Sequence, residues 1–143
     1  MITIGIDPGK NGGIAVIDKL GKAYADKMPE TLQDLFEHFD SICLSHDGDC
    51  RAYIEQVHSS PQMGVKSAFT FGNGFGHLEM ALTCFEIPFE RIRPQAWQKT
   101  LGCMTKGDKN VSKRRAQELF PSLKITHSTA DALLIAEYGR RLK

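Results

Sequence analysis

The sequence lacks the marks of membrane and secreted proteins. Its longest uninterrupted apolar run, at residues 132–136, is far shorter than the ~18 residues that a membrane-spanning helix needs. No basic segment followed by an apolar one stands at the N-terminus, so no secretory signal is predicted. From these absences we expect a soluble, unexported protein that acts in the cytoplasm, with no membrane partner.

Cysteines are few, and their spacing matches no known framework. The four of them, Cys43, Cys50, Cys84 and Cys103, form no CxxC pair. Disulfide frameworks are typical of small secreted chains, and structural zinc sites usually have closely paired ligands. We therefore predict reduced thiols and no zinc site.

Net charge is also low, but the charges are unevenly distributed. The 143 residues carry a formal charge of +1, which does not by itself indicate a nucleic-acid partner. Residues 91–115 nevertheless hold eight basic side chains and one acid, whereas residues 26–50 hold seven acids and one lysine. The molecule is therefore polarised. These runs are either binding surfaces or the solvated faces of two helices.

Hydrophobic periodicity predicts one α/β domain covering residues 1–143. Apolar runs and alternation predict strands at residues 2–6, 12–18, 22–28, 52–54 and 87–93. Helical spacing predicts helices that begin after Thr31 and at residues 65–84, 94–101, 110–120 and 129–142. This order predicts a mixed sheet whose first three strands form a meander.

Three acidic residues are predicted at the ends of elements. Asp7 ends the first strand, Glu55 ends the strand at residues 52–54, and Asp131 lies in the first turn of the last helix. Carboxylates that point together repel one another unless a cation lies between them. Such oxygen ligands suit Mg²⁺ or Mn²⁺, and two of these ions can activate water and stabilise the leaving oxygen in phosphodiester hydrolysis.

Each acid also has a purely structural interpretation. Asp7 precedes Pro8 and Gly9 and fits a turn, and Glu55 fits the end of an edge strand. Ser128 and Asp131 have the spacing of a capping box. The glycines after Asp7 also fit a phosphate-binding nest of the kind in actin-like ATPases, but those enzymes need a much longer chain.

Short motifs along the chain occur in the order and approximate spacing of one family. They are GIDPG at residues 5–9, IEQV at 54–57 and ADALLIA at 130–136. On these motifs nearly the whole chain resembles RuvC-type Holliday junction resolvases of the ribonuclease H-like fold. The short bacteriophage and prophage branch is the most similar, through FGNGFG at 71–76, PQAWQK at 94–99 and AEYGRR at 136–141.

The resemblance implies a mixed five-stranded sheet flanked by helices and a homodimeric endonuclease that resolves four-way DNA junctions by paired nicks. Asp7, Glu55 and Asp131 match the family's catalytic acids, which hold two Mg²⁺ or Mn²⁺ ions and no nucleotide cofactor. The family's fourth metal-site residue, an acid or a histidine, falls here at Ser128, one residue after His127. A hydroxyl replaces an anionic ligand poorly, so either His127 reaches the site or three acids suffice.

The same resemblance points to DNA-contacting residues. His58 stands where the family often has an aromatic side chain that probes the junction centre; imidazole stacks on a base but is a smaller wedge than Phe. Lys109 best matches the family's catalytic lysine near the scissile phosphate. The other basic residues assigned to the DNA backbone are Lys99, Lys106, Lys113 and Arg114.

The helix at residues 65–84 matches a helix of the family's dimer interface. Gly72, Gly74 and Gly76 would allow another helix to approach closely, which would offset their cost of about 1 kcal/mol each in a helix. Packing within one subunit is the alternative. Three other functions remain open: a broader nuclease for flaps, forks and three-way junctions, a ribonuclease H, and a non-catalytic DNA-binding domain.

Overall fold

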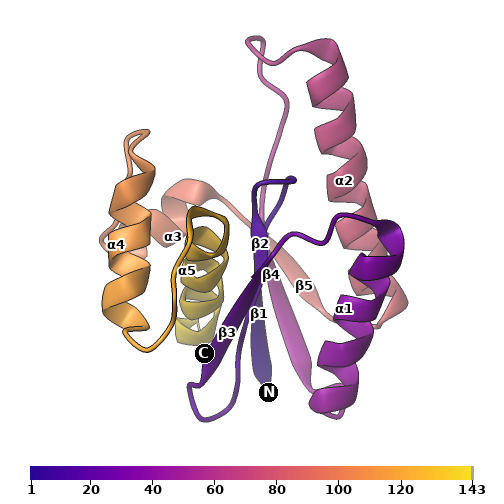
Figure 1. Ribbon diagram of the computed structural model, residues 1–143, viewed down its shortest axis with the longest axis vertical. Coiled ribbons are helices and arrows are strands. Elements are labelled where there is room, and N and C mark those ends of the chain that lie inside the picture. The colour runs from indigo at the N-terminus through magenta and orange to yellow at the C-terminus, as the bar shows by residue number, and fades with distance from the viewer. Residues whose placement is uncertain (143) are drawn as a thin grey trace.

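A computed structural model describes residues 1–142 as a five-stranded sheet with helices on both faces (Figure 1). The strands are β1 (Ile2–Asp7), β2 (Gly13–Ile17), β3 (Ala23–Lys27), β4 (Cys50–Glu55) and β5 (Phe89–Ile92). The helices are α1 (Leu32–Ser45), α2 (Val65–Cys84), α3 (Pro94–Thr100), α4 (Lys109–Leu119) and α5 (His127–Arg141). The predicted α/β class and element order are confirmed. No helix within residues 1–142 is long and apolar enough to cross a membrane.

The sheet brings two of the predicted site residues to one edge. Its strand order is β3-β2-β1-β4-β5, and β2 runs antiparallel to both β1 and β3, which makes the predicted meander. β4 runs parallel to β1, with Ile54 opposite Ile6. Because neighbouring parallel strands end at the same edge of a sheet, Asp7 and Glu55, the last residues of β1 and β4, lie close together at that edge.

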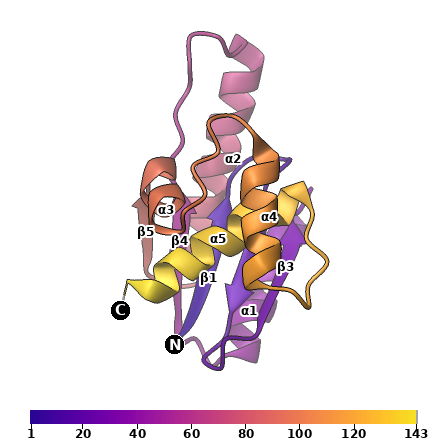
Figure 2. The same ribbon diagram turned by 90° about the vertical axis from the view of Figure 1, so that its left-hand side faces the viewer.

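Side chains of the central strand alternate between two cores. Ile2, Ile4 and Ile6 are fully buried in the core beneath α1 and α2. The opposite core lies under α3, α4 and α5, which Figure 2 shows in front of the sheet. A strand that is covered on both faces reads as a nearly continuous apolar run, as β1 does.

Helix α5 lies directly against the sheet. A Cβ atom at Gly5 would collide with the carbonyl oxygen of Ala132, and one at Gly139 would collide with the ring of Tyr53. Glycine at these two positions therefore allows helix and strands to approach at backbone distance. This contact fixes where α5 places its side chains relative to the end of β1.

The start of α5 differs from the prediction. The helix begins at His127, two residues earlier than expected, and its N-cap is Thr126. Thr129 Oγ1 accepts a hydrogen bond from the Thr126 backbone N–H at 3.1 Å, and the two hydroxyls lie 3.2 Å apart. The capping-box interpretation of Ser128 and Asp131 is therefore wrong, and Asp131 lies beyond the first turn.

Candidate active site

The three acids come together where β1 and β4 end beneath α5. The pKa of Asp7 is raised to about 8, first by burial and then by the negative charges of Asp131 and Glu55, while the charge of Lys109 opposes the shift. Asp7 interacts with both other acids, so the strand ends and the helix converge on one region. Metal-free Asp7 is consequently protonated over most of the neutral pH range.

The other two acids are also shifted toward the protonated form. Burial raises the pKa of Glu55, a hydrogen bond from Trp97 lowers it, and the charge of Asp131 raises it. Burial raises the pKa of Asp131, while Ser112, Lys109 and His127 lower it. Burial is the largest cause of the raised pKa of both carboxyl groups. The site therefore concentrates carboxylates that this chain only partly neutralises.

One oxygen in the site has no partner from the chain. Asp131 Oδ1 is buried, and it has no hydrogen bond within the described residues 1–142. A buried acceptor without a partner costs about 1–3 kcal/mol. Among the described side chains, no three or more of His, Cys, Asp or Glu lie close enough together to form a metal site as they stand. Three carboxylates, one of which has a buried oxygen without a partner, nonetheless have the donor chemistry that a divalent cation prefers.

Lys109 is the basic residue whose charge reaches the acids. It is the first residue of α4, after Asp108, whose side chain accepts a hydrogen bond from the Asn110 backbone N–H at 2.9 Å. Its charge lowers the pKa of both Asp7 and Asp131. An exposed lysine at the start of a helix, beside buried carboxylates, can contact a phosphate that enters the site.

The two candidates for a fourth site residue lie differently. His127 is the exposed first residue of α5, and its charge lowers the pKa of Asp131. Ser128 is half-buried, and its backbone carbonyl oxygen lies against Gly13. Neither side chain makes a hydrogen bond to an acid within residues 1–142. The effect of its charge on Asp131 favours His127 over Ser128 as the fourth residue of the site.

Some basic side chains of residues 91–115 are bound to other groups of the protein, and others have no ion-pair partner. Arg91 pairs with Glu79 of α2, and Arg115 donates to the Leu101 carbonyl oxygen at 2.9 Å, so both are used inside the fold. The predicted DNA-contacting residues Lys99, Lys106, Lys113 and Arg114 form no ion pair with any described residue, and only Lys113 is partly covered. His58 is exposed in the segment that follows β4. These residues come from the α3 and α4 side of the sheet (Figure 2) and from the end of β4.

Sequence reasoning missed one residue of the site. The indole Nε1–H of Trp97 donates to Glu55 Oε2 at 2.7 Å, and Trp97 is fully buried. Trp97 is the only tryptophan of the chain and lies in the PQAWQK motif, in which the sequence assigns a role to Lys99 alone. The hydrogen bond joins residues 42 positions apart, so no local sequence pattern predicts it.

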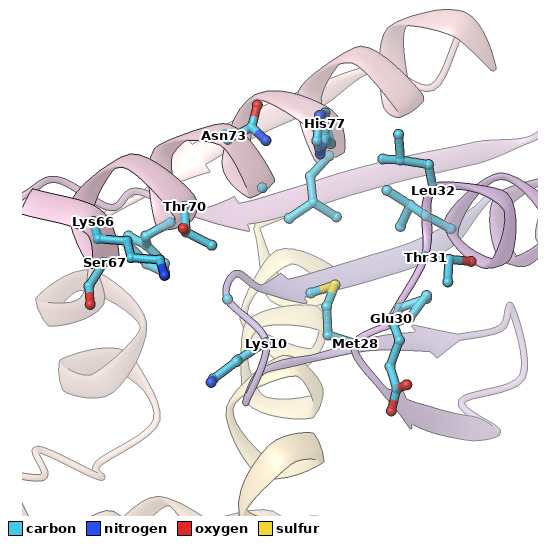
Figure 3. A pocket seen from close by; sticks show the side chains of 16 residues that line it. Lys10, Met28, Glu30, Thr31, Leu32, Lys66, Ser67, Thr70, Asn73 and His77 are labelled. Atoms are coloured by element: carbon cyan, nitrogen blue, oxygen red, sulfur yellow. The ribbon is translucent and has the colours of Figure 1, made fainter.

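A separate cavity of about 570 Å³ lies on the other face of the sheet, between α1 and α2. Figure 3 shows Lys10 and Lys66 at its rim, with Asn73 and His77 of α2 opposite Leu32 of α1. Its walls are mostly apolar. None of the three acids lines it, so it is distinct from the candidate active site.

No protein-family model matches this sequence, and a search of curated proteins finds no significant match. Solved structures do match it. Thermus thermophilus RuvC in complex with a Holliday junction substrate superposes with a TM-score of 0.71 at 17% identity, over 99% of this chain and 96% of that chain. Another Thermus thermophilus RuvC structure gives 0.66 at 19% identity, with the same coverage of 99% and 96%.

These superpositions define the class of fold. The chain is an α/β protein with a mixed five-stranded sheet of the ribonuclease H-like type. Within that class it has the fold of RuvC, along nearly the full length of both chains.

Proposed function

We propose that this chain is a metal-dependent endonuclease that cuts four-way DNA junctions. The observation that carries the proposal is the convergence of Asp7, Glu55 and Asp131, which are mostly buried and only partly neutralised. The fold supports it, because the RuvC that shares this fold has been solved with a Holliday junction substrate. A non-catalytic DNA-binding domain would gain nothing from three acids that raise one another's pKa.

The chain's residues have separate tasks in this proposal. Asp7, Glu55 and Asp131 would hold two Mg²⁺ or Mn²⁺ ions, which when bound activate water and stabilise the leaving oxygen. Asp7 must first lose its proton, since its pKa is about 8 without a cation. Lys109 would neutralise a phosphate oxygen beside the acids. His127 would approach the site from the start of α5.

The free basic side chains would hold the arms of the junction. Lys99, Lys106, Lys113 and Arg114 have no ion-pair partner in the described chain, and they lie on α3, on α4 and in the loop between these helices. Contacts to phosphates supply affinity but no sequence reading, so binding should weaken steeply with salt. His58, exposed three residues after Glu55, would contact bases at the branch point. Its small ring favours activity on several branched DNAs.

A second copy of the chain would complete the enzyme. One candidate site per chain cuts one strand, so paired nicks require two chains. On α2, Val65, Phe69 and Met80 are exposed, at 89%, 77% and 58%. They share a helix face with Gly72 and Gly76, where a Cβ atom would meet nothing within 4 Å. We propose this face, the α2 stripe, as the contact between two copies.

The central test is cleavage by Asp7→Asn. The variant should bind a synthetic four-way junction in Ca²⁺ with unchanged affinity and lose Mg²⁺-dependent cleavage. Glu86→Gln, which removes an exposed acid beyond the far end of α2, is the matched control and should cut normally. Undiminished cutting by Asp7→Asn would contradict the proposal.

The substrate class needs a panel of DNAs. We expect four-way junctions to be cut at least as fast as flaps, forks and three-way junctions, and an RNA–DNA hybrid to remain intact. Equal rates on all branched DNAs would indicate the broader nuclease. Cleavage of the hybrid alone would indicate a ribonuclease H.

The contact between copies is tested by sedimentation. Phe69→Asp should shift the protein to monomers, because a charge would be buried in the α2 stripe. Leu44→Asp introduces the same charge at another exposed apolar residue, on α1, and should leave the dimer intact. A wild-type protein that remains monomeric, with or without junction DNA, would overturn this part of the proposal.

A further inference from the structure

The fold fixes Trp97 over the end of β4. Ile92, the last residue of β5, is paired with Glu55, and the Gln56 backbone N–H donates to the Ile92 carbonyl oxygen at 2.7 Å. Arg93 caps α3 and Pro94 begins it, so the chain turns into the helix directly after this pair. Trp97, one turn further, therefore lies beside Glu55.

The contact between the two side chains is specific. Trp97 Nε1 lies 2.7 Å from Glu55 Oε2, within the range of charge-assisted hydrogen bonds. The indole is fully buried in the core beneath α5, with Ile92 and Leu101, so it cannot swing away without opening that core. Within the described residues this is the only hydrogen bond of the Glu55 side chain. Oε2 is thus held, while Oε1 carries no hydrogen bond.

We propose that Trp97 is a positioning residue whose indole N–H fixes the Glu55 carboxylate in one orientation and reserves Oε1 for a divalent cation. The inference rests on the proposed function, because it assigns the cation to the same three acids. Trp97 acts through Glu55. Hydrogen bonds behind a metal ligand typically change metal affinity by about 10–100-fold.

The alternative is that Glu55 merely satisfies a buried indole N–H. Buried tryptophans usually have such a partner, and the carboxylate would then serve the core. The two roles differ in what they change. A structural role affects the stability of the fold, whereas a positioning role affects the affinity for the cation at unchanged DNA affinity.

Trp97→Phe separates the two roles, since it keeps a buried aromatic ring and removes the N–H. We expect its affinity for Mn²⁺, measured without DNA from the EPR signal of the free ion, to fall about tenfold. The Mn²⁺ concentration for half-maximal junction cleavage should rise by the same factor, with junction binding in Ca²⁺ unchanged. Leu101→Val, in the same core and without a polar group, is the control and should lower stability but leave Mn²⁺ affinity within twofold. A Trp97→Phe protein whose Mn²⁺ affinity equals that of the wild type would overturn the proposal.

A second measurement needs no Trp97 variant. Because the chain has one tryptophan, its indole N–H gives a single NMR signal after ¹⁵N-tryptophan labelling. We expect this signal to move in Glu55→Gln and, in the wild type, on addition of Mg²⁺, but not to respond to Mg²⁺ in Asp7→Asn. A signal insensitive to both Glu55→Gln and Mg²⁺ would overturn the proposal even if Trp97→Phe fails to fold.

The outcomes distinguish this proposal from the proposed function. If Mn²⁺ affinity depends on Trp97 but no branched DNA is cut, the positioning role stands and the nuclease assignment fails. If junctions are cut and Trp97→Phe needs no more Mn²⁺ than the wild type, the nuclease assignment stands and the positioning role fails. A wild-type chain that binds no Mn²⁺ would overturn both.

Discussion

On the α5 face of the sheet, glycine lets two elements touch at backbone distance, whereas on α2 three glycines have open space around them. A Cβ atom at Gly5 would collide with Ala132, and one at Gly139 with Tyr53. At Gly72, Gly74 and Gly76 of α2 a Cβ atom would meet nothing within 4 Å. Glycine therefore permits tight packing of α5 on one face of the sheet, which we call the closed face. On the face that carries α2, which we call the open face, the glycines have no close neighbour.

The difference in packing between the two faces corresponds to two different surfaces, the site of the acids and the exposed surface of α2. The close contact between α5 and β1 brings Asp131 to Asp7, so dense packing within one chain builds the site of the acids. The other face keeps a cavity of about 570 Å³ between α1 and α2 and apolar side chains exposed along the α2 stripe. That face is suited to association with another molecule.

The largest expected effect tests the closed face. Gly5→Ala should cost about 3 kcal/mol of unfolding free energy or prevent folding, because the added methyl group would collide with the backbone of Ala132 and Ala136. Gly72→Ala adds the same methyl group on the open face and should not destabilise the fold. Urea denaturation of both proteins gives the comparison. Equal stability of the two variants would show that α5 can retreat from β1 at little cost.

The next effect comes from the acids that the closed face brings together. The pKa of Asp7 is about 8 in the folded protein and ordinarily 3.8, so the folded state binds more protons than the unfolded state between these two pH values. Stability without metal should therefore fall as pH rises from about 4 to about 8, by at most about 1.4 kcal/mol per pH unit for one proton. Asp7→Asn should flatten this dependence.

Urea denaturation in EDTA at several pH values measures it, and the difference between wild type and Asp7→Asn isolates Asp7. Excess Mg²⁺ should oppose the loss at high pH, because the cation binds the deprotonated acids. A wild-type curve parallel to that of Asp7→Asn would place Asp7 in a more solvated position than the structure gives it.

Much of the fold follows from sequence patterns that act locally. Alternation in β1, the spacing after Thr31 and the apolar segment of α5 each predict their element, since burial of one face determines the period. The start of α5 was predicted two residues late. Its capping box uses Thr129, a hydroxyl where Glu or Gln is usual, so Ser128 with Asp131 matched the common pattern better.

The candidate site likewise has one feature that the sequence predicts and others that only the structure shows. That Asp7 and Glu55 lie close together follows from parallel β1 and β4, which the element order makes plausible from sequence. The hydrogen bond from Trp97 joins residues 42 positions apart, and no local pattern announces it. Likewise, the pairing of Arg91 with Glu79 depends on how α2 lies beside β5. The sequence therefore predicts that the acids lie close together, whereas contacts between distant side chains, such as those of Trp97 and Arg91, require the structure.

Helix caps on the two faces give a smaller contrast. Thr126→Ala and Thr31→Ala should each cost about 1 kcal/mol, because each removes a hydroxyl that accepts a hydrogen bond from a backbone N–H in the first turn of a helix. Only Thr126→Ala should also reduce cleavage, since α5 carries Asp131 and α1 carries no site residue. Thermal unfolding and junction cleavage measure the two effects. Equal cleavage by both variants would show that the position of Asp131 does not depend on the cap.

The smallest effect separates space that is merely open from space that a second copy occupies. Gly74→Ala should raise the free energy of unfolding by up to about 1 kcal/mol, since alanine is the better helix former and its methyl group enters the cavity without contact. Gly72→Ala with Gly76→Ala should stabilise the helix likewise but weaken self-association, because both lie on the α2 stripe. Sedimentation and urea denaturation of the two proteins distinguish these effects. If the double variant dimerises as well as Gly74→Ala does, a second copy does not approach α2 at backbone distance, and the glycines of the open face serve no close contact.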